Sequence, residues 1–339
     1  MSENTSREVR LKTRPVGLPK ESDFELAEVT VGAPGEDEVL IRNLYMSVDP
    51  YMRGRMIDRK SYATPFEVGA VMHGGAVGEV VESRADGFQV GDHVLSMNGW
   101  RERFLSSGDT LRKEDGNLAP LSAYLGVLGM PGLTAYIGLE DIGKPEPGQT
   151  VFVSGAAGAV GSAACQLAMA KGCRVVGSAG SEEKVYWLQN EAGVDVALNY
   201  KTVGNLQTAL LEACPDGIDI YFDNVGGDHL EAALTGMNDF GRIIGCGSIS
   251  TYNATAPEPG PRNLFHMIGK RLLWKGFIVS DHVDRFPAFA QHMGRLIAQG
   301  KLVWRETVHE GIKNAPQAFM GLFSGGNVGK MIVRLAPDA

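Results

Sequence analysis

The amino-acid sequence predicts an α/β protein in which a doubly wound parallel sheet is joined to a second, β-rich domain. From residue 150 onward, nearly continuous apolar segments alternate with helical ones, which is typical of a parallel sheet covered on both faces. Residues 1 to about 125 instead contain short strands separated by turn residues. Glycine contributes 44 of the 339 residues, about twice its average usage of ~7%, and suits many tight turns and close backbone approaches.

The composition and net charge of the chain limit the kinds of partner that it can bind. The chain is 44% hydrophobic and 21% charged, as in ordinary globular proteins, and its net charge is −8 with scattered lysine and arginine. This charge disfavours nucleic acid and anionic membranes as partners, so we expect a small-molecule ligand. No run reaches the ~18 apolar residues of a membrane span, and the first residues, MSENTSREVR, lack the apolar core of a signal peptide. We therefore expect a cytoplasmic protein.

The first domain is expected to be an irregular β-barrel or sandwich. Its β-rich segments are 38–48 (EVLIRNLYMSV), 75–83 (GAVGEVVES) and 84–96 (RADGFQVGDHVLS). A helical pattern then occupies 128–148 and ends in a cluster of Pro and Gly. Residues 315–335 offer a helix, a glycine-rich turn and a strand that could rejoin this first domain.

The second domain alternates strands with helices. The apolar segment TVFVSG (150–155) precedes a helix over 158–171, and CRVVGSAG (173–180) precedes a helix over 181–193. Further strands are expected at DVALNY (195–200), IDIYFDNVGG (218–227), GRIIGCGSIS (241–250) and LLWKGFIVSD (272–281).

A glycine-rich turn joins the first of these strands to its helix. Gly155, Gly158 and Gly161 form a G-x-x-G-x-x-G pattern. Gly158 would let the backbone approach a diphosphate, Gly161 would let the helix pack closely on the strand, and the N–H groups at the helix N-terminus would face the phosphates. In this strand–turn–helix context the pattern predicts a Rossmann dinucleotide-binding site, with an ordinary tight turn as the alternative.

The end of the next strand indicates which dinucleotide binds. Enzymes of this fold that use NAD place Asp or Glu there, whereas this strand ends in Gly-Ser-Ala-Gly (177–180). A carboxylate ~4 Å from a 2′-phosphate would cost about 4 kcal/mol, so its absence permits NADPH. Lys184 falls in the first turn of the following helix, where the helix dipole disfavours a cation unless an anion lies beside it. We expect NADP(H); a solvated lysine beside Glu182 and Glu183 is the alternative.

Several runs resemble the medium-chain dehydrogenase/reductase superfamily and, within it, the zinc-free branch of NADPH-dependent enone reductases. This branch includes prostaglandin reductases, plant double-bond reductases and bacterial curcumin reductases. The matching runs are SVDPYMRGRM (47–56), VLGMPGLTAYIGL (127–139), GAAGAVGS (155–162), YFDNVGG (221–227), STYNAT (250–255) and GKMIVRL (329–335). They follow the family's order and span the whole chain.

The resemblance implies a GroES-like barrel domain for substrate and catalysis over 1–128 and 315–339, a Rossmann NADP-binding domain over 129–314, and a homodimer. The positions that match the family's nucleotide-binding residues are Gly155, Gly158, Ala159, Val160, Gly161, Thr134, Lys184, Tyr200, Asn224, Cys246, Gly247, Ser248, Phe277, Ile278, Val279 and Asn327. Lys184 and Tyr200 are thereby expected to contact the 2′-phosphate. From the sequence pattern alone, Tyr200 is interpreted as an aromatic residue that packs at the end of a strand.

A metal is not expected. The run MHGGAVGEV (72–80) is similar to the Gly-His-Glu segment of zinc alcohol dehydrogenases, with His73 in the place of a ligand. A catalytic zinc needs three protein ligands, and the runs where the others would lie, YMSVDP and LGMPG, contain no cysteine. The four cysteines form no CxxC pair and are expected to be structural thiols; they are Cys165, Cys173, Cys214 and Cys246.

Without a metal, hydride addition to a conjugated carbonyl needs a hydrogen-bond donor where charge develops on oxygen. Tyr252, just past an apolar strand, is predicted to be that donor. Carboxyl ends of strands face the ligand in doubly wound sheets, and a phenol stays protonated at neutral pH. The resemblance suggests that the ribose hydroxyl of the cofactor shares this role, and it places Tyr51 and Met130 in the substrate pocket. A loop tyrosine at 252 and barrel packing for Tyr51 are the alternatives.

The predicted function is an NADPH-dependent reductase of the carbon–carbon double bond of α,β-unsaturated ketones and aldehydes. Hydride would go to the β carbon and the enolate would then be protonated, without a metal. A quinone oxidoreductase of the same fold and a non-catalytic NADPH-binding protein are the alternatives. The missing zinc ligands disfavour an alcohol dehydrogenase.

Overall fold

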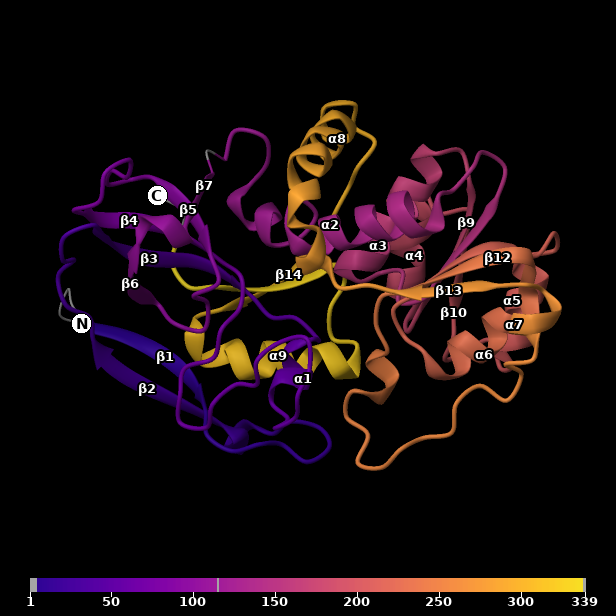
Figure 1. The fold of residues 1–339 in the computed structure, drawn as a ribbon, viewed down its shortest axis with the longest axis horizontal. Coiled ribbons are helices and arrows are strands. Elements are labelled where there is room, and N and C mark those ends of the chain that lie inside the picture. Colours follow the sequence, from indigo (N-terminus) through magenta and orange to yellow (C-terminus); the bar gives the residue numbers. More distant parts are fainter. Residues whose placement is uncertain (1–4, 115, 338–339) are drawn as a thin grey trace. The chain divides into compact units, whose positions relative to one another are not determined.

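The computed structural model describes residues 5–114 and 116–337, which divide into two compact units (Figure 1). Unit 1 takes in the described residues of 1–125, 306–327 and 331–339. Unit 2 takes in 126–305 and 328–330. Each unit has a core of its own and is described by itself. No helix in the described ranges combines the length and the apolar character that a membrane crossing requires.

Unit 2 is built on a parallel sheet. In the part of the chain that the structure describes, six strands lie in the order β10-β9-β8-β11-β12-β13, which is the Rossmann order 3-2-1-4-5-6. The strands are β8 (Thr150–Val153), β9 (Arg174–Ala179), β10 (Val196–Asn199), β11 (Ile218–Asp223), β12 (Met237–Gly245) and β13 (Leu273–Gly276). Every residue of β8 is buried, as expected for a strand covered on both faces. This sheet confirms the predicted fold class.

Helices cover both faces of this sheet. Figure 1 shows α3 and α4 on one face and α5, α6 and α7 on the other. The helices are α2 (Met130–Ile137), α3 (Ala159–Ala170), α4 (Glu182–Asn190), α5 (Leu206–Ala213), α6 (Gly227–Gly236), α7 (His266–Gly269) and α8 (Phe286–Ala298). A π-helical turn spans Gly138–Gly143, and 3₁₀ turns span Ile249–Thr251 and Val279–Arg285. Ser181 caps α4, since its Oγ accepts a hydrogen bond from Lys184 N (3.3 Å).

The core of unit 2 fixes the register of its central strands. Phe152 of β8 lies beside Val176 of β9 and beside Tyr221 of β11. The rings of Phe152 and Tyr221 stack with centroids 5.0 Å apart. Because alternate residues of these strands are buried on opposite faces, a slip of one residue would exchange the two faces of the sheet.

Unit 1 is antiparallel and β-rich. Within the described residues, β1 and β2 form a two-stranded sheet, and a seven-stranded sheet runs β14-β15-β3-β4-β5-β7 with β6 paired to β3. The strands are β1 (Thr5–Leu11), β2 (Phe24–Thr30), β3 (Glu38–Ser47), β4 (Ala76–Ser83), β5 (His93–Ser96), β6 (Arg103–Ser107), β7 (Arg112–Glu114), β14 (Glu306–Glu310) and β15 (Lys330–Arg334). The α-helices are α1 (Met52–Arg55) and α9 (Ala315–Ser324). Trp100 stacks on Phe24 and meets Phe319 of α9 edge-on in the core.

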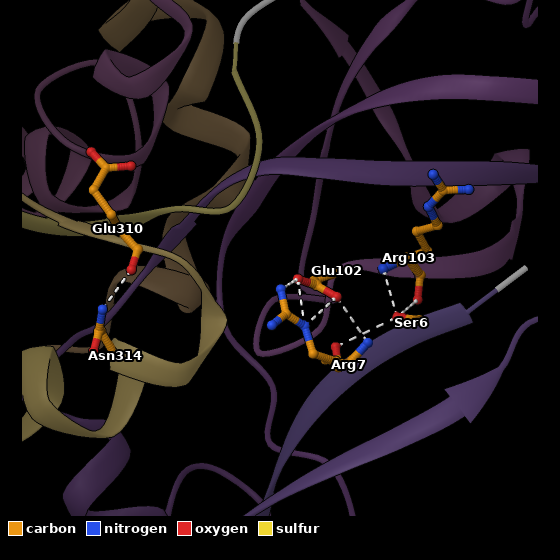
Figure 2. Close-up of polar contacts among 6 residues, drawn as sticks. All are labelled: Ser6, Arg7, Glu102, Arg103, Glu310 and Asn314. Carbon is orange, nitrogen blue, oxygen red and sulfur yellow. Dashed lines mark hydrogen bonds and ion pairs between the residues drawn. The ribbon is translucent and has the colours of Figure 1, made fainter. Parts of the chain in front are cut away.

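Side chains attach β1 to the start of β6, as Figure 2 shows. Ser6 Oγ accepts a hydrogen bond from Arg103 N (2.9 Å) and donates one to Arg103 O (3.2 Å). Arg7 N donates to the carboxylate of Glu102 (2.9 Å), and the Arg7 guanidinium forms an ion pair with the same group. This bond to Glu102 raises the pKa of Arg7. The small sheet is thereby fixed to the larger one.

After unit 2, the chain returns to unit 1 at residue 306, earlier than the sequence predicts. The sequence predicts a Rossmann domain over 129–314, whereas residues 306–314 lie in unit 1. The physical reason is that β14 joins the sheet of unit 1 beside β15, and the Asn314 side chain closes the following turn by donating to Glu310 O (2.6 Å; Figure 2). The predicted return of the last strand is confirmed, because β15 pairs antiparallel with β3.

Candidate functional site

The glycine turn 155–161 follows β8, at the point where the strand order reverses between β8 and β11. Gly155 has a φ of +60°, which favours glycine. A Cβ on Gly161 would lie 2.3 Å from Gly155 O, so a side chain there would push α3 away from the turn. The fold itself therefore requires both of these glycines.

Gly158 is different, because its conformation does not demand glycine and a Cβ there would meet a tight contact and not a collision. Its φ of −81° and ψ of 174° suit any residue, and among the described atoms a Cβ would meet only Gly155 O, at 3.3 Å. Gly158 is the N-cap of the 12-residue helix α3 and offers no capping side chain. The first intrahelical bond runs from Ser162 N to Gly158 O (2.9 Å), so the N–H groups of 159–161 lie outside the helical ladder. These N–H groups and the helix dipole suit an anion.

Residues 328–330 of unit 2 support the same turn. Gly329 N donates to Ala157 O (2.8 Å). Gly329 has a φ of +69°, and a Cβ there would lie 1.9 Å from Arg305 O. A segment distant in sequence thus holds the glycine turn from one side. Asn327, a predicted nucleotide-binding residue, precedes this segment and falls in unit 1.

One carboxylate oxygen organises the end of β11. Asp223 is buried, and its Oδ1 accepts hydrogen bonds from Tyr221 Oη (2.7 Å), Gly226 N (2.7 Å), Val225 N (3.0 Å) and Ser154 Oγ (3.3 Å). Burial raises the pKa of Asp223, and these donors oppose that shift. Because Ser154 directly follows β8, this cluster ties together the ends of two adjacent strands.

The backbone of Asp223 also determines where β12 ends. Asp223 O accepts hydrogen bonds from Cys246 N and Gly247 N, both at 3.0 Å. The sequence predicts a strand over 241–250, but β12 ends at Gly245. That part of the prediction is wrong because these two N–H groups turn toward Asp223, which makes 246–248 a loop at the edge of the sheet.

Tyr252 lies at this same edge. It follows the 3₁₀ turn Ile249–Thr251 and is half-buried. Its Oη accepts a hydrogen bond from Ser248 N (3.3 Å), and a Cβ on Gly247 would lie 3.1 Å from that oxygen. Asn224 connects this loop with the glycine turn, since Asn224 O accepts from Ile249 N (3.3 Å) and Asn224 Nδ2 donates to Ser154 O (2.8 Å).

The ends of β9 and β10 bring an aromatic ring and two cations together. Tyr200 N donates to Ala179 O (3.1 Å), and a Cβ on Gly180 would lie 2.8 Å from Tyr200 Oη. Lys184 is half-buried in the first turn of α4. Burial, and then the ammonium group of Lys201, lower the pKa of Lys184. Glu183 in the same turn of α4 has a smaller, opposite effect on the pKa of Lys184.

The remaining predicted residues fall at three places. Met130 and Thr134 are one turn apart on α2, where Thr134 Oγ1 donates to Met130 O (2.8 Å) and Met130 is 38% exposed. Residues 277–279 are half-buried and follow β13, at the same edge of the sheet as Tyr252. Tyr51 belongs to unit 1, where it packs against the core; burial, and then Asp49, raise its pKa.

His73 is in contact with a cation. Arg101 Nη2 lies 3.4 Å from His73 Nδ1. Burial, and then Arg101 and Arg55, lower the pKa of His73. In residues 5–114 and 116–337, no three His, Cys, Asp or Glu side chains gather closely enough to hold a metal ion.

The sequence analysis misses Ser154, Tyr221 and Asp223. A usable signal exists, because Ser154 and Asp223 are polar residues at the ends of two otherwise apolar strands. In the Rossmann strand order these two strands are neighbours. Buried polar groups at adjacent strand ends must satisfy one another, so their contact follows once the order is known.

We expect Asp223→Asn to preserve the turn after β11 and Asp223→Ala to disrupt it. An asparagine Oδ1 can accept the same hydrogen bonds, whereas alanine leaves buried donors unpaired at about 1–3 kcal/mol each. Urea unfolding at pH 7 should therefore show Asp223→Ala at least about 3 kcal/mol less stable than wild type. An alanine variant as stable as the asparagine one would contradict this account.

The stability difference between wild type and Asp223→Asn should depend on pH. Because the pKa of Asp223 is raised above 3.8 in the folded protein, the folded state holds the proton more tightly than the unfolded chain. Stability should therefore fall as pH rises through the folded-state pKa and recover as pH falls. Asp223→Asn lacks this proton, so wild type should gain stability relative to it between pH 7 and about pH 4.

Comparison with known proteins relates this geometry to a family. A family model described as "N-terminal domain of oxidoreductase" matches residues 7–113, and one described as "Zinc-binding dehydrogenase" matches 159–295. The 2-alkenal reductase (NADP(+)-dependent) of Nicotiana tabacum is 46% identical over 343 residues, covering 99% of each chain. The NADPH-dependent curcumin reductase of Escherichia coli is 45% identical, covering 97% of this chain and 96% of its own length.

A solved structure agrees with these relatives. The crystal structure of CurA from Vibrio vulnificus in complex with NADPH superimposes with a TM-score of 0.93 at 42% identity, covering 98% of this chain and all of that one. Similarity of this extent shows both family and fold. The chain belongs to the medium-chain dehydrogenase/reductase superfamily, in its zinc-free branch of enone reductases.

Proposed function

We propose that this protein is an NADPH-dependent reductase of the carbon–carbon double bond of α,β-unsaturated ketones and aldehydes. The observation that carries the proposal is the similarity over nearly the full chain to a 2-alkenal reductase and a curcumin reductase. A 2-alkenal is an aldehyde conjugated with a double bond. The gathering of the glycine turn, Asn224 and Tyr252 at one edge of the sheet supports it.

The residues at this edge fit the diphosphate of NADPH. Gly158 has no side chain although its backbone conformation does not require glycine. A ligand that approaches the backbone at this point would explain the glycine. The N–H groups of Ala159, Val160 and Gly161 would then bind the diphosphate. The other predicted residues are proposed to bind the rest of the dinucleotide; in unit 2 they are Gly155, Thr134, Asn224, Cys246, Gly247, Ser248, Phe277, Ile278 and Val279, and in unit 1 Asn327.

The 2′-phosphate would be bound by Lys184 and Tyr200. Lys184 is half-buried beside Lys201 in the first turn of α4, a position that a neighbouring anion stabilises. The carboxylate of Glu182 accepts hydrogen bonds from Asn199 Nδ2 (2.6 Å) and Thr202 Oγ1 (3.2 Å), and that of Glu183 raises the pKa of Lys184 against the two larger effects.

When bound, NADPH supplies a hydride to the β carbon of the substrate. The protein's part is to stabilise the negative charge that develops on the substrate's carbonyl oxygen. We assign this to the phenol of Tyr252. Its oxygen accepts from Ser248 N (3.3 Å), which fixes its position and polarises its O–H for donation. A single donor of this kind contributes about 10²–10³ in rate.

Two residues are proposed to contact the substrate, Tyr51 and Met130. Tyr51 belongs to unit 1 and Met130, at the start of α2, to unit 2, and each is considered within its own unit. Tyr51 is half-buried, and Met130 keeps 38% of its surface exposed, which suits contact with an apolar substrate. The sequence-derived limits, 1–128 with 315–339 and 129–314, remain our proposal for the functional domains.

A homodimer in the cytoplasm completes the proposal. β13 ends the sheet of unit 2 and all four of its residues are exposed, among them Leu273 (52%) and Trp274 (44%). An apolar edge strand is normally covered, and a second copy of the chain can cover it. The free thiols of Cys165, Cys173 and Cys214 suit a reducing compartment.

The two kinds of glycine in the turn should separate folding from binding. We expect Gly161→Ala to lower the thermal midpoint and abolish NADPH binding, because its Cβ would lie 2.3 Å from Gly155 O. Gly158→Ala should lower the thermal midpoint much less, because its Cβ would lie 3.3 Å from the same oxygen, and should still lose NADPH affinity. Calorimetric titration with NADPH, together with thermal unfolding, measures both effects. Normal affinity in Gly158→Ala would show that no ligand approaches this backbone.

A panel of linear enones, 2-alkenals, benzoquinones and alcohols, each with NADPH and NADH, tests the proposed function. We expect saturated carbonyl products, a preference for NADPH, and a kcat reduced about 10²-fold in Tyr252→Phe with unchanged NADPH affinity. Tyr186→Phe is the matched control, since Tyr186 is an exposed tyrosine on α4 (63%). Turnover of quinones alone would favour a quinone oxidoreductase, and no turnover a binding protein.

Trp274→Glu should convert a dimer into monomers, because it puts a charge on the exposed edge strand. Sedimentation velocity measures the change. Tyr186→Glu, on α4, serves as the control for adding a surface charge. A wild-type protein that sediments as a monomer at micromolar concentration would exclude the proposed dimer.

A further inference from the structure

His229 is a buried, titratable residue that the proposed mechanism does not use. It lies in the first turn of α6 and is 5% exposed. Its Nε2 is buried, and among the described residues it has no hydrogen-bond partner. Burying such a nitrogen costs free energy that an apolar side chain of similar size would avoid. The ring contacts of His229, and not a hydrogen bond of Nε2, are therefore what it can contribute to its surroundings.

The His229 ring touches Tyr200. The two ring centroids are 5.0 Å apart and the rings are inclined at 78°, an edge-to-face arrangement. Aromatic pairs in this geometry attract each other beyond the area that they bury. Tyr200 is otherwise 37% exposed, so His229 is a rigid, buried support behind a partly exposed ring.

Two further contacts define the position of Tyr200. Its main-chain N donates to Ala179 O (3.1 Å) at the end of β9. Its hydroxyl lies over the bare Cα of Gly180, where a Cβ would be 2.8 Å away. The ring is therefore held between the end of β9 and His229, at the sheet edge where α4 begins with Glu182 and carries Lys184 in its first turn.

The support that His229 gives is not electrostatic. Burial lowers the pKa of His229 to about 4, against a smaller opposite effect of Asp228. The imidazole is thus neutral at pH 7 and neither attracts nor repels a phosphate by charge. Any influence of His229 on a ligand at Tyr200 must pass through the contact between the two rings.

We propose that His229 is a positioning residue, which holds the Tyr200 ring in the orientation that receives the 2′-phosphate of the coenzyme and so contributes to the choice of NADPH over NADH. This inference rests on the proposed function, because it assumes that Tyr200 lies at the adenosine end of the coenzyme. It adds a residue from α6 to a site otherwise built from β9, α4 and the end of β10.

The test uses probes that carry only the adenosine end of the coenzyme. Adenosine 2′,5′-bisphosphate contains the 2′-phosphate, and adenosine 5′-monophosphate lacks it. Isothermal titration of the full-length protein with both probes measures the contribution of the 2′-phosphate without any turnover. We expect His229→Ala to weaken binding of the bisphosphate about three- to tenfold, the range of one aromatic pair, and to leave monophosphate binding within about twofold.

Conservative replacement and a double mutant separate positioning from a general loss of structure. His229→Phe keeps an aromatic edge against Tyr200 and should restore bisphosphate affinity to within about twofold of wild type. In a Tyr200→Ala background, His229→Ala should cause no further loss, since the two residues act as one unit. His229→Leu replaces His229→Ala if the latter does not fold, as judged by its thermal midpoint.

His292→Ala is the matched control. His292 lies on α8, its Nε2 is likewise buried without a partner among the described residues, and its ring meets that of Tyr136 at 5.6 Å. This variant should leave the preference for the bisphosphate unchanged.

The outcomes distinguish this inference from the proposed function. If wild type binds both probes equally, the assignment of NADPH itself fails, and the role of His229 fails with it. If wild type prefers the bisphosphate and the His229 variants keep that preference, only the positioning role is overturned. Equal weakening of both probes, or additive losses in the double mutant, would likewise overturn it, because His229 would then act on the fold as a whole.

Discussion

The edge of the sheet in unit 2 depends on one buried carboxylate oxygen. Asp223 Oδ1 accepts hydrogen bonds from a tyrosine hydroxyl, a serine hydroxyl and two backbone N–H groups. Desolvation of a carboxylate is unfavourable, and only such convergence of donors makes it tolerable at this depth. In return, the oxygen fixes the backbone of 224–227, and the carbonyl of the same residue fixes 246–247. The loops that follow β11 and β12 are therefore both joined to the end of β8 through Asp223.

The glycines of unit 2 divide into those that the fold requires and those that leave space. Gly155 and Gly329 have positive φ, and a side chain on Gly161 would collide with the backbone of the turn. Gly158 and Gly180 do not have positive φ, and a Cβ on either would not collide with the backbone. Gly158 leaves the N-terminus of α3 open, and Gly180 provides the surface on which Tyr200 lies. A glycine count alone does not separate these two uses, because the difference lies in what surrounds each Cα.

Much of the fold could be predicted from the sequence because its signals are local. The apolar segment 150–155, the glycine turn and the capping Ser181 each report on a few neighbouring residues, and the structure has β8, α3 and α4 where these signals occur. The end of β12 could not be predicted in this way. Residues 246–250 have strand-like composition, but Cys246 N and Gly247 N both bond to the single carbonyl of Asp223, and Ser248 N bonds to the Tyr252 hydroxyl.

The candidate site could likewise be predicted only where its signals are local. The glycine turn, Lys184 and Tyr252 stand out in the sequence by residue type and spacing. The cluster of Ser154, Tyr221 and Asp223 did not, because Tyr221 and Ser154 are 67 residues apart and meet only through the strand order. The ring contact between Tyr200 and His229 depends in addition on how α6 packs against the end of β10, which no local pattern records.

The bond from Gly329 to Ala157 has a consequence for biosynthesis. The ribosome makes the glycine turn and all six strands of its sheet well before it reaches Gly329. Until that late segment arrives, Ala157 O lacks this partner, and the glycine turn of a nascent chain lacks one of its contacts. A ligand that binds the turn would therefore meet its complete form only late in translation, when it can stabilise the folded protein by mass action.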